Sequence, residues 1–147
     1  ASSSMITPLM NTLSAISSEN KHYTKKEFIA TFKVDKELLE KLLHDEILLP
    51  ISDDDFTEKE ASIIRLVRYF IEVGIEYEIL KLYVFHAKAL SLIENQMQSQ
   101  LCDIRTDENF PTLWKIVFET LFNAKEYIFN RQTYKMYFST LQNEVLT

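Results

Sequence analysis

One glycine and three prolines among 147 residues are the feature that most constrains the fold of this chain. Both residue types interrupt helices, and tight turns between strands depend on them. Their scarcity therefore predicts an all-α protein with short connections. With 46% hydrophobic and 12% aromatic residues, the chain can bury a core in one domain, or in a small domain that carries an oligomerisation arm.

The only glycine, Gly74, lies in the stretch Phe56–Leu80. Thr57 and Glu60 have the spacing of a capping box at a helix start. Gly74 then supplies the left-handed residue that ends this helix, and the carboxylates of Glu76–Glu78 favour the start of the next one. We predict a helix, a glycine stop and a second helix. The apolar face of the first helix is formed by Ile63, Ile64, Val67, Phe70 and Ile71.

Residues 1–22 form a separate segment rich in Ser, Thr and Asn. This composition is typical of a flexible tail. Apolar residues nevertheless recur there every three to four positions, which is the spacing of a short docked helix. Both interpretations remain open for this segment.

Two short helices are predicted between Tyr23 and His44. Thr24 and Glu27 form a second capping box, and Asp35 caps a helix that runs to His44. Short helices joined by a turn of about three to four residues form the helix-turn-helix unit, whose second helix enters a DNA groove. The segments that follow, Ile47–Ile51 and Ser52–Asp55, are expected to form a small wing and its tip.

The longest apolar pattern runs from Tyr77 to about Ile104. A helix of this length exceeds roughly 35 Å at about 1.5 Å per residue. A partner is needed to cover its apolar stripe, as in a coiled coil, so we expect a homodimer through residues 77–104. The residues expected at this interface are Leu80, Val84, Ala87, Leu90, Ile93, Met97 and Leu101.

Residues 105–147 are predicted to form a C-terminal, aromatic-rich helical region. Arg105–Phe110 is a polar break, and Pro111 suits the first turn of a last helix. That helix is broadly apolar and needs burial on more than one side. Its aromatic stripe suits a core or a dimer interface, or a pocket for a hydrophobic small-molecule effector. The residues expected to line such a pocket are Trp114, Phe118, Phe122 and Tyr134.

The order of these elements resembles the MerR family of bacterial transcriptional regulators. The resemblance covers roughly residues 23–80 and implies a winged helix-turn-helix domain there. It further implies that the following long helix pairs antiparallel with its copy, and that the homodimer binds DNA. The segments that carry the resemblance are Tyr23–Glu27, Val34–Asp35, Leu48–Pro50, Phe56–Glu58 and Ile71–Leu80.

Two residues depart from the family's DNA-contacting pattern. Glu40 stands where the second helix is expected to carry an arginine, and Asp54 stands where the wing is expected to carry one. A carboxylate repels phosphate and cannot make the bidentate contact of arginine. The net charge of −6 also differs from the basic character of most DNA-binding domains. The alternative function is a protein-interaction or adaptor module that keeps the fold without DNA contact.

A DNA-binding role would depend on a local basic patch. The lysines of the helix-turn-helix alternate with acidic residues, so an ordinary solvated surface is the competing interpretation. The two arginines could reach a phosphate beside the wing or pair with nearby carboxylates. The candidate DNA-binding residues are Lys25, Lys26, Lys33, Lys36, Lys41, Arg65 and Arg68.

The sequence points to no catalytic, metal or cofactor site. It has no Gly-rich phosphate loop, nucleophile elbow or paired His/Glu motif. Asp53–Asp55 lacks the length and glycine of a calcium loop, and Cys102 alone cannot complete a thiolate site. A single cysteine suggests a reducing compartment, and no apolar run approaches the roughly 20 residues of a membrane span. We therefore expect a cytoplasmic, non-enzymatic protein.

Overall fold

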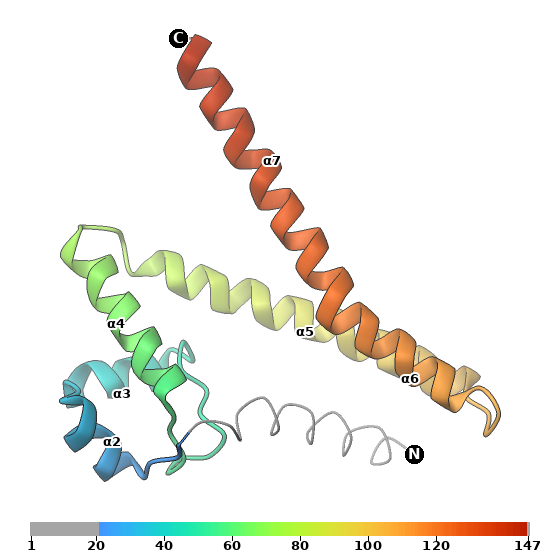
Figure 1. The fold of residues 1–147 in the computed structure, drawn as a ribbon, viewed down its shortest axis with the longest axis horizontal. Helices are drawn as coiled ribbons and strands as arrows, with labels where there is room; N and C mark the ends of the chain where they lie inside the picture. Colours follow the sequence, from blue (N-terminus) through green and yellow to red (C-terminus); the bar gives the residue numbers. More distant parts are fainter. Residues whose placement is uncertain (1–20, 147) are drawn as a thin grey trace. The chain divides into compact units, whose positions relative to one another are not determined.

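A computed structural model describes residues 21–146, with side chains to residue 144. The prediction of an all-α fold is confirmed, because these residues form helices and no strand. Most of the segment considered above as a tail or docked helix lies outside the described residues. The helices are α2 (Lys25–Phe32), α3 (Lys36–His44), α4 (Glu58–Glu72), α5 (Glu78–Ile104), α6 (Phe110–Glu119), the π-helical turn η1 (Thr120–Ala124) and α7 (Lys125–Leu146) (Figure 1).

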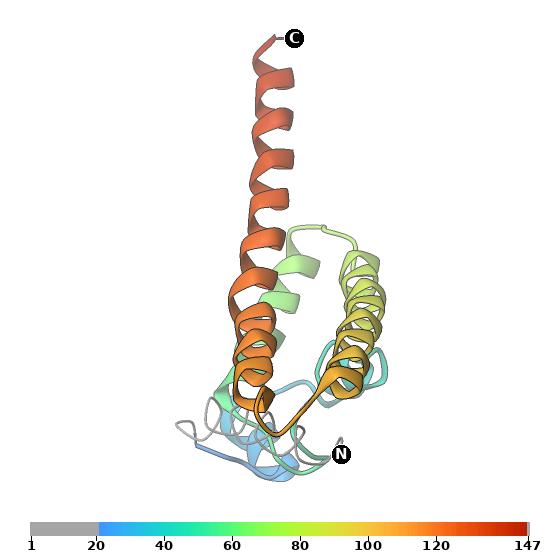
Figure 2. The same ribbon diagram turned by 90° about the vertical axis from the view of Figure 1, so that its right-hand side faces the viewer.

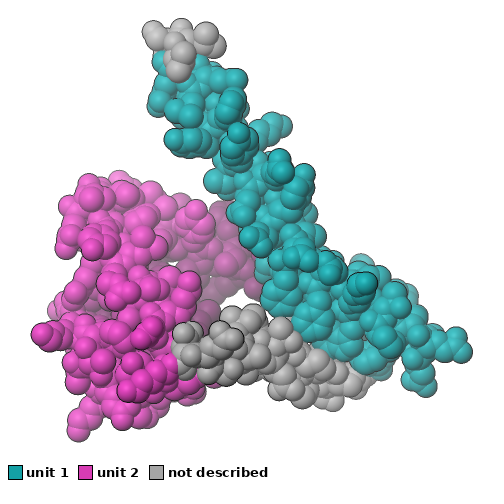
Figure 3. Space-filling model, viewed as in Figure 1, with its two compact units in different colours: residues 1–2, 92–147 teal, residues 3–91 magenta. Residues whose placement is uncertain are grey.

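The chain divides into two compact units, and the division falls inside α5 (Figure 3). We call the described residues 21–91 the N-terminal unit and residues 92–146 the C-terminal unit. Each unit is described by itself.

The N-terminal unit has a small, dense core between α2, α3 and α4. Phe28 is completely buried and stacks on Phe56, with ring centroids 4.9 Å apart. Leu39 and Leu42 of α3 and Val67 of α4 are buried to the same degree. The helices begin where the sequence indicates: Thr24 and Thr57 form capping boxes, and Asp35 accepts hydrogen bonds from the next turn.

Three left-handed residues end the helices of this unit: Lys33 (φ 52°), Glu46 (φ 58°) and Gly74 (φ 87°). At Gly74, the amide of Ile75 donates to the carbonyl of Phe70, and the amide of Gly74 donates to that of Ile71. These two hydrogen bonds form a Schellman motif, as the glycine predicted. Lys33 and Glu46 adopt the same backbone conformation without the freedom of glycine.

Replacing Gly74 by alanine is expected to lower the free energy of unfolding by about 1 kcal/mol. The cost is backbone strain, because a Cβ at Gly74 meets no atom within 4 Å. The change Lys33→Gly is the matched control of opposite sign, and it is expected to stabilise the unit. Urea unfolding followed by circular dichroism measures both, and a Gly74→Ala variant as stable as the parent would contradict the assignment.

Residues 47–55 form a loop rather than a regular wing; we call it the 47–55 loop. The described residues show only isolated bridges here, between Tyr23 and Phe56 and between Ser52 and Asp55. Tyr23 and Phe56 exchange two backbone hydrogen bonds of 2.8 and 2.9 Å, which fasten the end of this loop to the entry of α2. Pro50 has no amide hydrogen to extend a ladder.

The C-terminal unit packs around Leu101 of α5 and Val117 of α6, which are 6% and 4% exposed. Asn109 closes the connection between these helices by donating to the carbonyl of Ile104 over 3.0 Å. Lys125 and Glu94 form an ion pair of 3.1 Å across the unit. Figures 1 and 2 show α6, η1 and α7 as one continuous rod.

The far part of this rod leaves its apolar side chains in solvent. Every side chain from Glu126 to Glu144 is exposed, including Met136 (71%) and Tyr137 (63%). The sequence indicated that this helix needs burial on more than one side, and residues 126–144 receive none within the described chain. Exposed apolar surface of this extent marks an interaction site more often than a free surface.

Candidate interaction face of the N-terminal unit

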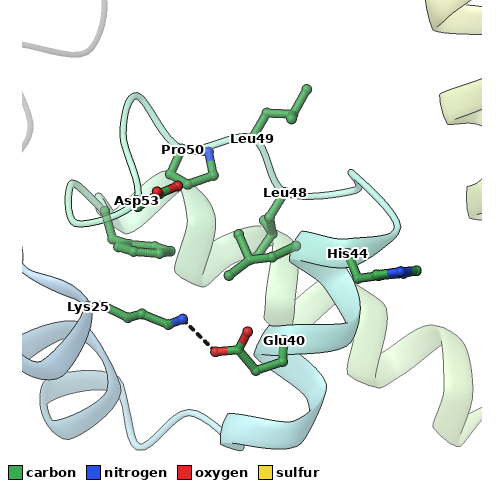
Figure 4. A pocket seen from close by; sticks show the side chains of 9 residues that line it. Lys25, Glu40, His44, Leu48, Leu49, Pro50 and Asp53 are labelled. Carbon is green, nitrogen blue, oxygen red and sulfur yellow. Dashed lines mark ion pairs between the residues drawn. The ribbon is translucent and has the colours of Figure 1, made fainter.

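The two carboxylates that depart from the MerR pattern both bind Lys25. The Lys25 ammonium lies 2.5 Å from the Glu40 carboxylate, which joins α2 to α3 (Figure 4). The backbone amide of Lys25 donates to Asp54 of the 47–55 loop over 2.8 Å. This amide belongs to the first turn of α2, where a negative charge is favourable. Glu40 and Asp54 thus serve as internal partners that hold the start of α2.

The neighbouring Asp55 also binds within the unit. Its carboxylate lies 2.5 Å from Nδ1 of His22. Of the three consecutive aspartates, only Asp53 forms no ion pair or hydrogen bond with the part of the chain that the structure describes. The loop therefore presents one free carboxylate next to the ion pair of Lys25 and Glu40.

The other candidate DNA-binding residues differ in their surroundings. Lys41 stacks its ammonium 4.2 Å from the Tyr77 ring centroid. Lys26, Lys33 and Lys36 are exposed, as are Arg65 and Arg68 on α4. Within residues 21–146, neither arginine forms an ion pair with a nearby carboxylate.

The charge of this part of the chain is strongly acidic. Residues 23–80 contain eight Lys and Arg against fourteen Asp and Glu, which equals the whole net charge of −6. The residues outside this segment contain equal numbers of acidic and basic side chains. The acidity therefore belongs to the segment expected to bind DNA, and not to a distant tail.

A polar cluster ties the end of α3 to the start of α5. The hydroxyl of Tyr77 donates to Asp45 over 2.7 Å, and Nδ1 of His44 lies 3.2 Å from the same residue. The hydrogen bonds from Tyr77 and His44 lower the pKa of Asp45 below its ordinary value. Burial, together with the adjacent Asp45 carboxylate, raises the pKa of Tyr77. Lys88 adds an ion pair to Glu46 at 2.9 Å.

We expect Tyr77→Phe to lower the thermal midpoint by a few degrees at neutral pH. The folded-state pKa of Asp45 is lowered, so its contribution is present above the ordinary value of 3.8 and is lost as pH falls through the folded pKa. The variant should therefore lose less stability than the parent on acidification below pH 3.8. Melting curves across pH measure this, with Tyr69→Phe as the exposed control. Parallel pH profiles for Tyr77→Phe and the parent would contradict the role of Asp45.

A cavity of about 540 Å³ opens to solvent between α2, α3 and the 47–55 loop; we call it the loop groove. Figure 4 shows the ion pair of Lys25 and Glu40 on one side and the loop on the other. Leu43, Leu48 and Phe56 supply apolar wall, while Leu49 (74% exposed) and Asp53 lie along the loop. The sequence does not reveal this groove, because its walls come from segments that only folding brings together.

The residues expected at the dimer interface occupy different environments along α5. Ala87 and Ile93 are exposed, but Leu101 is buried in the C-terminal unit. Leu80, Val84, Leu90 and Met97 are half-buried. The most exposed large apolar side chains of α5 are Tyr83, Leu92, Phe85, Ile104 and Ile93, and of these only Ile93 was expected at the interface. The sequence could have indicated these residues, since apolar residues occupy more than one face of this helix.

Three of the four candidate effector-binding residues lie together. Trp114, Phe118 and Phe122 form a row along α6 and η1, with successive ring centroids 5.1 and 5.7 Å apart. Tyr134 lies twelve residues beyond Phe122 and instead pairs with Phe138 at 5.7 Å. The row is half-buried in the C-terminal unit.

Neither a metal site nor a membrane span is found in the described part of the chain. No group of three or more His, Cys, Asp or Glu residues there could hold a metal ion. None of the helices over residues 21–146 has the length and hydropathy required to cross a bilayer. The candidate surfaces are therefore the loop groove and the exposed apolar faces of α5 and α7.

No protein-family model, curated protein or solved structure matches this chain. The function must be argued from the residues and their geometry.

Proposed function

We propose that this protein is a protein-interaction module built on a helix-turn-helix scaffold, and that it binds protein instead of DNA. The observation that carries the proposal is the binding of Lys25 by Glu40 and Asp54. The Lys25 ammonium pairs with Glu40 of its own unit, and Asp54 accepts from the backbone amide of Lys25, so a phosphate would have to compete with Glu40 for this cation.

The electrostatics of the surrounding surface support this assignment. Phosphate neutralisation supplies most of the affinity of non-specific DNA binding. The 23–80 segment instead carries six more acidic than basic side chains. Glu40 and Asp53 line the same groove, so a duplex approaching it would face two carboxylates.

The exposed apolar surface provides the contacts that an interaction module needs. Phe85 of α5 is 66% exposed, and Tyr134 and Tyr137 of α7 are 61% and 63% exposed. Aromatic side chains of this kind dominate protein interfaces. We propose that α5 forms the homodimer and that α7 extends the contact surface for a protein partner.

A fluorescence-anisotropy titration of duplex DNA from the protein's own promoter, at 50 mM salt, tests the proposal. We expect no saturable binding by the parent protein. Saturable binding whose affinity falls steeply with salt would contradict the proposal, because this dependence is the signature of phosphate contacts.

The second candidate is a homodimeric DNA-binding regulator of the MerR type. The α2–α3 pair with its short turn favours it, and so do the exposed lysines Lys26, Lys33 and Lys36. In this case α3 would enter the major groove, and its dimer spacing would set the half-site distance. The same titration distinguishes the two candidates.

A further inference from the structure

We infer that the loop groove is a docking site for a partner protein segment that carries an arginine beside aliphatic residues. The inference rests on the proposed function and names the chemistry of the partner. It is carried by the shape of the groove, its apolar walls and the sign of its charge.

The size and openness of the groove favour a peptide segment over a small molecule. Its volume of about 540 Å³ lies within the range of ligand sites. Small-molecule sites, however, enclose most of the ligand surface. Here Leu49 is 74% exposed and the His44 side chain is 89% exposed, so these walls are incomplete in the free protein. A segment of a folded partner can cover them from outside.

The charge of the groove selects a cationic side chain. Lys25 and Glu40 neutralise each other, and Asp53 adds an unpaired carboxylate. Arginine fits better than lysine, because its planar guanidinium can donate two parallel hydrogen bonds to one carboxylate, here that of Asp53. An anionic segment would be repelled by the unpaired carboxylate of Asp53. Leu43, Leu48 and Leu49 then suit the aliphatic neighbours of that arginine.

Nuclear magnetic resonance titration of the full chain with the capped peptide Leu-Arg-Leu-Leu tests the inference. We expect amide shifts at Glu40, Leu49 and Asp53, and none with the peptide Leu-Glu-Leu-Leu. The variants Asp53→Asn and Leu49→Ser change exposed side chains, so both should fold. Each is expected to weaken binding about fivefold to tenfold, the order of one lost charge-assisted or apolar contact.

Matched controls keep the result specific to the groove. Glu37→Gln removes the same charge from α3 outside the groove, and Leu66→Ser removes an exposed leucine from α4. Both should bind as the parent does. Absence of groove shifts at millimolar peptide, shifts confined to α7, or equal affinity of parent and Asp53→Asn would each overturn the inference.

Adding duplex DNA to the same sample separates this inference from the proposed function. DNA-induced shifts on α3 would overturn the proposed function. If DNA causes no shifts and the peptide causes none in the loop groove, only the docking site is overturned.

Discussion

Replacing Phe28 by alanine is expected to cost the N-terminal unit about 3–5 kcal/mol of unfolding free energy. Its ring is completely buried, stacks on Phe56 at 4.9 Å and makes a tilted contact with Phe32 at 5.2 Å. The loss is a large share of the roughly 5–15 kcal/mol that stabilise a typical domain. Because Phe56 ends the 47–55 loop, the substitution should also release that loop from α2.

The matched control is Tyr69→Ala on α4, another aromatic residue, 64% exposed in the same unit. It is expected to change the unfolding free energy by no more than about 0.5 kcal/mol. Urea unfolding monitored by circular dichroism measures both variants. Equal losses for Phe28→Ala and Tyr69→Ala would show that the core does not lie where the structure places it.

The double variant Glu40→Arg/Asp53→Arg is expected to create DNA binding. It removes two carboxylates from the α3 face and frees Lys25 from its ion pair. Each new phosphate contact should raise the affinity at low salt and add about 0.9 to the magnitude of the salt slope. Asp54 is left unchanged because it accepts from the amide of Lys25.

The double variant Glu72→Arg/Glu76→Arg carries the same charge change at the end of α4 and provides the control. It should gain only the weak attraction that follows from net charge. Anisotropy titrations at several salt concentrations compare the two variants. Equal affinities would mean that the α3 face is not shaped for DNA, which would undermine the explanation of Glu40 and Asp53 as the residues that exclude it.

The helices of this chain could be predicted because their signals are local. The capping boxes at Thr24 and Thr57 and the glycine stop at Gly74 each lie within a few residues of the boundary they set. The long helix also followed from a continuous apolar pattern, and the structure places it over Glu78–Ile104.

The left-handed residues Lys33 and Glu46 could not be predicted in this way. Neither residue type favours that conformation, so tertiary packing of α3 against its neighbours must compensate for the strain. The π-helical turn η1 likewise interrupts what appeared in the sequence as one regular helix.

The site was harder to predict than the fold because it depends on distant pairs. Lys25 and Asp54 are 29 positions apart, and Tyr77 and Asp45 are 32 apart. Sequence reasoning identified Glu40 and Asp54 as departures from a DNA-binding pattern. It could not show that both carboxylates converge on one lysine.

The most direct test of the central claim is photo-crosslinking in the cell of origin. A diazirine amino acid at position 49, whose leucine is 74% exposed at the loop groove, reacts with protein and nucleic acid alike. We predict adducts with a protein partner, and their loss in the Asp53→Asn background. Adducts with DNA from position 49 would contradict the proposal that the N-terminal unit binds protein in place of DNA.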